Sequence, residues 1–336
     1  MEYRPLGNTG LLTSVIGLGC SRLGTSVFEG QTTEGVKLLH DAFDQGINLF
    51  DTADSYGYGS SERILGKAFH GKRDRVIIAS KGGFLPSSLA RFGQYLLPFV
   101  GPFRSFLTKK KSTLKQLSHK RQNFKTTYLK HALEQSLRRL GSDYIDVYQL
   151  HSPPRAILER DEIYRFLEQA RQEGKIRFFG ISVNSIEDGL CCLKKPHLAA
   201  LQVPVNILEQ EATAELLPSA FPDVGILARV PLARGLLTDA LRINTGYQAG
   251  QSSPASQHLQ RLHALCEQEG RRISDVAIQF LLRSEAISSI LVGTKSVEHL
   301  RRNILAAQQP ALSRDLLSHI ASLNSCSSSF SPHKLC

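Results

Sequence analysis

Short apolar runs, about four to eight residues long, alternate along this chain with stretches in which apolar residues recur at helical spacing. The runs lack strict polar–apolar alternation, so they predict strands that are covered on both faces. Eight strands are predicted, and they end near Gly19, Asp51, Lys81, His151, Ser182, Val205, Val230 and Val292. Because helices separate these strands, the pattern predicts one (β/α)8 TIM barrel, an α/β fold, and not a doubly wound sheet.

The chain is longer than a bare barrel requires. Such a barrel takes roughly 250 residues, whereas this sequence has 336. Two interruptions absorb the excess, one with several prolines at about residues 84–124 and one rich in Gly, Ser and Thr at about 235–256. We expect both insertions at the rim of a single barrel domain over residues 1–324, which starts with a β-hairpin and is followed by a loop or tail at 325–336.

Apolar segments and cysteines bear on the location of the protein. No apolar run approaches the length of a transmembrane helix, and the N-terminus lacks an apolar signal region. The cysteines are scattered and lack the paired spacing of zinc ligands, so reduced thiols are the simple interpretation. They are Cys20, Cys191, Cys192, Cys266, Cys326 and Cys336. We therefore expect a cytoplasmic protein without a bound metal.

Positive charge is concentrated in one part of the sequence. The net charge is +11, and residues 82–133 contain ten Lys or Arg side chains and no acidic one. An apolar stretch with prolines, residues 95–103, precedes most of these charges. Two interpretations stay open: a solvated flap, or an apolar lid whose basic part attracts an acidic substrate, an anionic carrier protein or a membrane surface. Nucleic-acid binding is not expected, because no recognised module or aromatic platform accompanies the charge.

Side chains suited to proton transfer stand at three predicted strand ends. Asp51 ends one strand and Tyr56 follows five residues later, Lys81 ends the next strand, and His151 ends the one after it. The carboxyl ends of parallel barrel strands meet at one rim, which is where this fold carries its chemistry. Each residue alone would more often be structural. Together, in this order, they predict a proton-transfer site.

Three motifs carry a resemblance to a known family. Phe50-Asp51-Thr52-Ala53-Asp54-Ser55-Tyr56-Gly57, Ala79-Ser80-Lys81 and Tyr148-Gln149-Leu150-His151 resemble the signature of the aldo-keto reductases, and the resemblance extends over about residues 3–304. It implies a TIM barrel that binds NADPH without a Rossmann domain. The implied roles are Tyr56 as general acid or base, Lys81 as its activator, Asp51 as the partner of Lys81, and His151 as the group that orients the substrate carbonyl.

The resemblance also implies binding residues. Those for the cofactor are Gly19, Cys20 and Ser21, then Ser182 and Gln202 at the carboxamide, then Arg229, then Pro231, Leu232, Arg234 and Gly235 around the pyrophosphate, and then Gly293, Thr294, Lys295, Ser296, His299, Arg302 and Asn303 around the adenosine phosphate. Those for the substrate are Tyr58, Phe84 and Leu85. The position of the residues around the adenosine phosphate is also expected on physical grounds. On this fold, the loops after strands seven and eight and the amides at a helix N-terminus form a phosphate site.

Three positions depart from the family pattern. An asparagine commonly follows the serine at 182, whereas this chain has Val183 and then Asn184. Arg229 stands where an aromatic ring often stacks on the nicotinamide, and its guanidinium could lie on a ring or reach the pyrophosphate. His299 stands where an arginine often contacts the 2′-phosphate. Recognition of that phosphate would then depend on Lys295, Arg301 or Arg302.

The expected activity is reduction of an aldehyde or ketone with NADPH, or the reverse reaction, with NADH the less favoured cofactor. An ammonium beside a tyrosine lowers the tyrosine pKa from its ordinary value of about 10, which is the role implied for Lys81. The alternative is a nucleotide-binding regulatory subunit that keeps the barrel and acts through protein contacts. We expect a small carbonyl or alcohol substrate, and a monomer or small homo-oligomer. The substrate itself is not encoded in any motif.

Overall fold

A closed barrel of parallel strands forms the centre of the molecule. The computed structural model describes residues 1–23, 29–85, 122–238 and 254–323. Within these ranges eight strands close in the order β10-β3-β4-β5-β6-β7-β8-β9. They are β3 (Ile16–Gly19), β4 (Leu49–Asp51), β5 (Ile77–Gly82), β6 (Ile145–His151), β7 (Ile176–Ser182), β8 (Leu198–Pro204), β9 (Gly225–Arg229) and β10 (Ile287–Val292). The predicted (β/α)8 barrel is confirmed.

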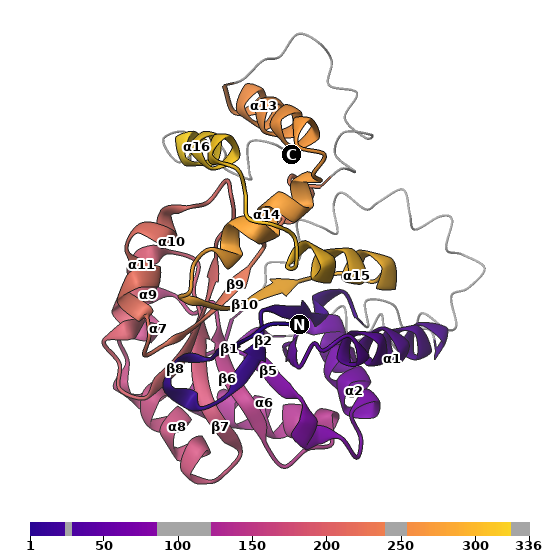
Figure 1. Cartoon of the computed structure of the whole chain (residues 1–336). Coiled ribbons are helices and arrows are strands. Elements are labelled where there is room, and N and C mark those ends of the chain that lie inside the picture. The colour runs from indigo at the N-terminus through magenta and orange to yellow at the C-terminus, as the bar shows by residue number, and fades with distance from the viewer. Residues whose placement is uncertain (24–28, 86–121, 239–253, 324–336) are drawn as a thin grey trace, which may run out of the picture.

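Helices surround the strands on the outside of the barrel (Figure 1). The longer ones are α1 (Glu29–Asp44), α2 (Ser60–Ala68), α6 (Thr126–Leu140), α8 (Asp161–Gln172), α9 (Ile186–Leu193), α13 (Pro254–Gln268), α14 (Ile273–Leu282), α15 (Val297–Ala306) and α16 (Arg314–Leu323). Shorter ones are α7 (Arg155–Leu158), α10 (Glu211–Ala214) and α11 (Leu216–Ala220). No helix in the described ranges combines the length and the apolarity that a membrane span requires.

The strands read as continuous apolar runs because both of their faces are buried. Every residue of β5 and of β10 is buried. Side chains that point inward from several strands form an interior cluster, and those that point outward pack under the helices. The interior cluster contains Leu49, Ile77, Ala79, Val147, Ala200, Leu227 and Leu291. The barrel is therefore a filled core, and its chemistry is confined to its rim.

The predicted N-terminal hairpin is present. Strands β1 (Tyr3–Pro5) and β2 (Leu12–Ser14) pair antiparallel around a short 3-10 turn, Gly7–Thr9. Leu6 is fully buried and packs with the interior cluster, so the hairpin seals one end of the barrel. Gly7 has a φ of +52°, and a Cβ at this position would lie 2.5 Å from the carbonyl oxygen of Asp223. Only glycine fits this turn.

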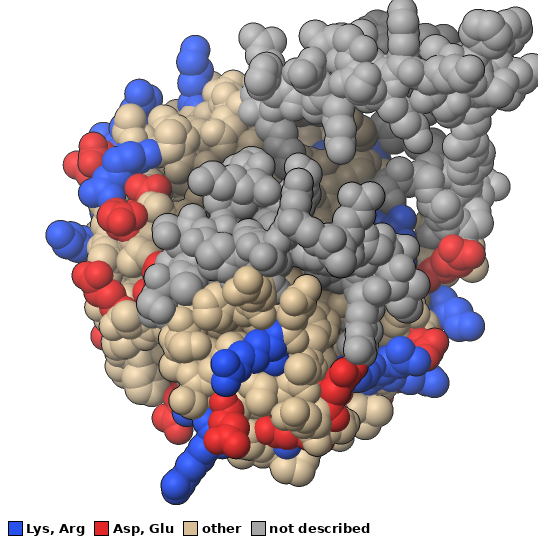
Figure 2. All heavy atoms as spheres, turned by 90° about the horizontal axis from the view of Figure 1, so that it is seen from above, with Lys and Arg blue, Asp and Glu red and all other residues tan. Residues whose placement is uncertain are grey.

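The insertions are described only at their ends. Asn123 N–H donates to the carbonyl of Gly83, and Phe84 pairs with Gln122, so the first insertion leaves and rejoins the barrel at one place. Residues 86–121, which include most of the predicted basic segment, lie outside the described residues, as do 239–253 of the second insertion and the predicted tail. Seen from above, the described surface carries positive and negative side chains interspersed around its margin (Figure 2).

Candidate active site

The four residues predicted for proton transfer lie together at the carboxyl-terminal rim. Asp51 is the last residue of β4, Lys81 is the next-to-last of β5, and His151 is the last of β6. These three strands are consecutive neighbours in the barrel. Tyr56 begins a 3-10 turn (Tyr56–Gly59) that leads from β4 into α2. The arrangement follows from topology, because parallel neighbours place their ends at the same rim.

Lys81 is the most enclosed charge of the site, with no exposed surface. Its Nζ donates to Asp51 Oδ1 at 2.6 Å and to the carbonyl of Thr52 at 2.8 Å. Burial opposes the ammonium charge, but Asp51 and then Tyr56 outweigh it, so the pKa of Lys81 is raised above its ordinary value. A buried ammonium is tolerable only with such a counter-ion. Lys81 therefore stays charged at neutral pH.

Tyr56 lies between the lysine and the histidine. Lys81 Nζ is 5.1 Å from the centroid of the Tyr56 ring, and the rings of Tyr56 and His151 stand nearly perpendicular with centroids 5.8 Å apart. Burial raises the pKa of Tyr56, and Lys81 offsets part of that increase. The lowering effect expected of Lys81 is present, but burial exceeds it. Tyr56 thus keeps its hydroxyl proton at neutral pH.

His151 is held by the ends of the first insertion. The Phe84 ring stands at 89° to the imidazole with centroids 4.4 Å apart. Gln122 Nε2 donates to the backbone carbonyls of His151, at 3.2 Å, and Ser152, at 2.8 Å. Phe84, expected to contact the substrate, is therefore placed directly at the imidazole, with Leu85 next in the chain and Tyr58 41% exposed on the rim.

A buried acid that no sequence motif indicated packs next to the strand that carries Lys81. Glu62 of α2 is fully buried and accepts hydrogen bonds from Ser80 Oγ and from Arg139 Nε, both at 2.6 Å. Ser80 precedes Lys81 on β5, so this pairing ties α2 and α6 to the strand that carries the ammonium. The sequence did contain a sign that Glu62 is buried. Glu62 lies on the same face of α2 as the buried Leu65, where a charged residue needs a partner.

Gln202 has a contact that the sequence did not indicate. Its Nε2 donates to Asp51 Oδ1 at 2.8 Å from across the barrel interior. Asp51 thereby accepts from both Gln202 and Lys81, which fixes the carboxylate. Ser182, at the end of β7, is the register partner of Gln202 on β8 and of His151 on β6. Both predicted carboxamide-binding residues are buried next to the proton-transfer group.

The residues expected to hold phosphates lie along β9, β10 and the loops that follow. Ser296 caps α15 by accepting from the His299 N–H at 3.3 Å, and its own N–H donates to Thr294 Oγ1 at 3.0 Å. Lys295, His299 and Arg302 are exposed, whereas Asn303 is buried. After β9 the backbone has positive φ at Val230, Ala233, Arg234 and Gly235. Such strained backbone is typical of functional loops.

The first and last barrel strands leave backbone uncovered at the rim. Gly19 ends β3 and Gly293 follows β10, which is its parallel neighbour. A Cβ at Gly293 would meet nothing closer than the Gly19 carbonyl oxygen, at 3.9 Å. A dinucleotide can approach such backbone closely, so these residues fit the expected cofactor. Cys20, which follows, is fully buried with its thiol against the Leu18 carbonyl, and burial raises its pKa.

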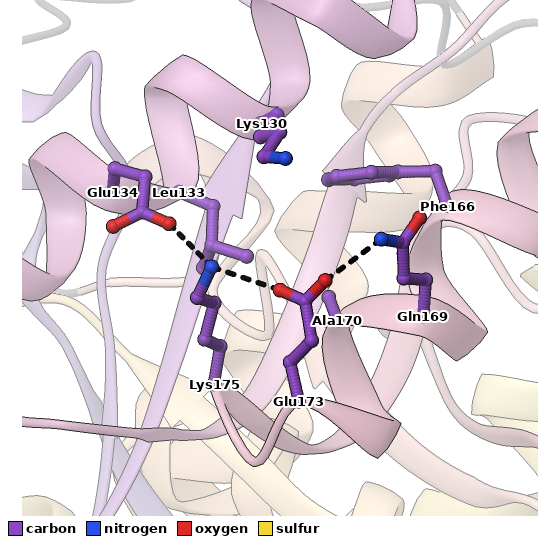
Figure 3. A pocket seen from close by; sticks show the side chains of 8 residues that line it. All are labelled: Lys130, Leu133, Glu134, Phe166, Gln169, Ala170, Glu173 and Lys175. Atoms are coloured by element: carbon purple, nitrogen blue, oxygen red, sulfur yellow. Dashed lines mark hydrogen bonds and ion pairs between the residues drawn. The ribbon is translucent and has the colours of Figure 1, made fainter.

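A hollow on the outside of the barrel does not compete with this site. It lies between α6 and α8, and its cavity volume is about 20 Å³, enough for a water molecule but not for an organic substrate. Lys175 bridges Glu134 and Glu173 there, and Glu173 also accepts from Gln169 (Figure 3). The described residues contain no group of three or more His, Cys, Asp or Glu side chains that could hold a metal ion.

Comparison with known proteins agrees with this geometry. The Aldo/keto reductase family profile matches residues 15–325. The chain is 30% identical over 325 residues to the uncharacterized oxidoreductase YqkF of Bacillus subtilis, covering 94% of each protein. It is 28% identical to L-galactose dehydrogenase of Arabidopsis thaliana, covering 92% of this chain and 89% of that protein. The aldo-keto reductase AKR11C1 from Bacillus halodurans, in its holo form, superimposes with a TM-score of 0.75 at 27% identity, with 96% of both chains covered. The chain therefore belongs to the aldo/keto reductase family of NAD(P)H-dependent oxidoreductases.

Proposed function

We propose that this protein reduces an aldehyde or ketone to an alcohol with NADPH, and that Tyr56 supplies the proton. The observation that carries the proposal is the buried Lys81 ammonium, held by Asp51 at 2.6 Å and facing the Tyr56 ring at 5.1 Å. An ammonium that touches both a carboxylate and a tyrosine, and is closed off from water, has a clear chemical use. It stabilises the tyrosinate that forms when the hydroxyl gives up its proton.

The proposed reaction needs two transfers to the carbonyl group. The bound cofactor supplies a hydride, which forms a C–H bond at the carbonyl carbon. The Tyr56 hydroxyl gives its proton to the carbonyl oxygen, and the resulting tyrosinate is balanced by the Lys81 ammonium. Asp51 keeps Lys81 charged throughout, while Gln202 fixes Asp51. The reverse reaction oxidises an alcohol with the same groups.

His151 has a separate proposed role at the carbonyl oxygen. Its ring lies beside the Tyr56 ring and is packed by Phe84. An imidazole N–H in this position donates to the carbonyl oxygen and stabilises the negative charge that develops there, as an oxyanion-hole donor does. Because Gln122 holds the backbone of the histidine, the orientation is set before substrate arrives.

The proposed cofactor site uses residues from several strand ends. Ser182 and Gln202 would hold the nicotinamide carboxamide, and the backbone at Gly19 and Gly293 would allow close approach of the dinucleotide. The loop at residues 231–235 straps the pyrophosphate. Lys295, Ser296 and Arg302 near the start of α15 recognise the 2′-phosphate, which is the basis for preferring NADPH to NADH.

The test is turnover of a panel of aldehydes, ketones and alcohols followed by NADPH absorbance. The proposal expects measurable reduction of simple aldehydes and its loss in Tyr56→Phe. Binding of NADPH without turnover of any carbonyl or alcohol would overturn it. No observation on the described residues favours the alternative of a regulatory subunit.

A further inference from the structure

Arg229 is a half-buried cation without a counter-ion among the described residues. It ends β9 at the rim, and its Nη2 donates to the Val183 carbonyl at 3.1 Å and to Asn184 Oδ1 at 2.7 Å. Both acceptors are neutral. Its Nε is buried and has no hydrogen-bond partner among the residues that the structure describes. No described carboxylate forms an ion pair with this guanidinium, whereas the fully buried cation of the site, Lys81, has Asp51.

The surroundings do not neutralise the charge. Burial lowers the pKa of Arg229, yet a guanidinium stays protonated in proteins. The charged and titratable groups that face it are Tyr56, Glu209, Arg234 and Asp51. Glu209 and Arg234 oppose one another in sign, and Asp51 is already paired with Lys81. A partly desolvated guanidinium with open donors is therefore arranged for an anion that the described residues do not provide.

One contact joins two departures from the family pattern. The asparagine that commonly follows the serine at 182 is displaced to Asn184, and the aromatic ring at 229 is replaced by arginine. The structure shows these two residues hydrogen-bonded to each other. Asn184 fixes one end of the guanidinium fork. The two changes thus form one physical unit.

We propose that Arg229, held by Asn184, binds a carboxylate or phosphate group of the carbonyl substrate, so that the enzyme prefers acidic carbonyl compounds. This inference rests on the function proposed above. A cofactor pyrophosphate could supply the same anionic oxygens. We favour the substrate because Tyr56 and Asp51, the groups at the reacting end, are among the titratable groups that face Arg229. The residues assigned to the phosphates follow β9 and β10 instead.

The test compares matched substrates in matched variants. The probes are 4-carboxybenzaldehyde and succinic semialdehyde, each against its methyl ester. In the wild type we expect the acids to have the higher kcat/KM. Arg229→Met should lower kcat/KM for the acids by about tenfold or more relative to the esters, as expected for loss of a charge-assisted hydrogen bond. Arg229→Lys should restore part of the preference. The control is Arg160→Met, which removes an exposed arginine that is paired with Glu162. It should change kcat/KM for neither the acids nor the esters.

A second readout does not depend on turnover. Calorimetry should detect succinate binding to the wild type and to Arg160→Met, and a large loss of it in Arg229→Met. If Arg229→Met fails to fold, Asn184→Ala tests the same pair of residues. The loss of kcat/KM for the acids should then be smaller, because the guanidinium is only less well oriented.

The proposal is overturned if the wild type does not prefer acids. It is also overturned if kcat/KM falls equally for acids and esters in Arg229→Met while NADPH binding, followed by cofactor fluorescence, weakens. Succinate binding without reduction of any carbonyl would contradict the proposed reductase activity and leave the anion site standing.

Discussion

Lys81 Nζ and Asp51 Oδ1 lie 2.6 Å apart inside the barrel rim, and neither side chain has more than 7% of its surface exposed. This pair sets how the protein responds to pH, since Asp51 holds the pKa of Lys81 up against burial. A base whose folded-state pKa is raised stabilises the fold below its unfolded pKa, about 10.4, and loses that contribution as the pH rises through the folded value.

Replacing Asp51 should reverse this dependence. In Asp51→Asn only burial remains as the main influence on Lys81, so its folded-state pKa should fall below the unfolded value. The unfolded chain then binds the extra proton, and stability should rise as the pH increases from 6 to 9. At pH 7 we expect a loss of up to about 3–5 kcal/mol in the free energy of unfolding. Urea denaturation across this pH range measures both effects, and a pH dependence equal to that of wild type would show that Asp51 does not control Lys81.

Tyr56→Phe should separate proton transfer from binding. The substitution removes a hydroxyl and keeps the ring that packs beside His151. Removal of a general acid should lower kcat by about 10²–10⁴. The dissociation constant for NADPH, from fluorescence titration, should change by less than about threefold, because no cofactor contact is assigned to this hydroxyl. A near-normal kcat would show that another group supplies the proton.

The acid behind the site should matter for stability. Glu62 is fully buried between Ser80 and Arg139. Glu62→Gln should cost about 3–5 kcal/mol, because Arg139 loses its charged partner in a low-dielectric environment. The control is Glu159→Gln, where the Arg155–Glu159 pair is about half exposed and is expected to contribute little to stability. Thermal and urea denaturation of both variants measure the difference. Equal, small effects would mean that the buried pair is dispensable.

Asp54 should give a pH dependence of the same sign as that of Lys81, but in a lower pH range. Its Oδ1 is buried without a hydrogen-bond partner in the described part of the chain, and burial raises its pKa from 3.8 to about 8. A folded acid with a raised pKa binds a proton that the unfolded chain releases, so its contribution to stability is lost as the pH rises from about 4 to about 8. Asp54→Asn should therefore gain stability relative to wild type as the pH increases over this interval. Urea denaturation of both proteins at pH 5 and pH 8 tests this prediction. A difference in the free energy of unfolding that is the same at both pH values would refute it.

The sequence was sufficient for the barrel and for the positions of the four site residues because both depend on local information. Continuous apolar runs mark strands buried on two faces, and a polar residue at the end of such a run must lie on the rim. This rule alone was enough to predict that Asp51, Lys81 and His151 lie on the rim. Their chemical roles remain proposals.

Contacts between distant elements were not predictable in the same way. The bond from Gln202 to Asp51 crosses the barrel interior, and the pairing of Glu62 with Arg139 joins two helices. Each depends on strand register and side-chain direction, which no single segment specifies. The Arg229–Asn184 contact likewise appeared in the sequence as two unrelated departures.

Cofactor preference provides the last test, and it concerns the start of α15. Lys295 is exposed just before the cap Ser296, whose hydroxyl accepts from the His299 N–H. A helix N-terminus flanked by a lysine attracts a phosphate through its amides and the ammonium charge. The 2′-phosphate is present in NADPH and absent from NADH, so Lys295→Ala should raise the KM for NADPH by about tenfold and leave the KM for NADH nearly unchanged. The wild-type preference should also shrink at high salt, since an exposed charge pair is screened. Lys194→Ala, which removes an exposed lysine after α9, is the matched control. Equal changes for both cofactors in Lys295→Ala would place the 2′-phosphate elsewhere on the rim.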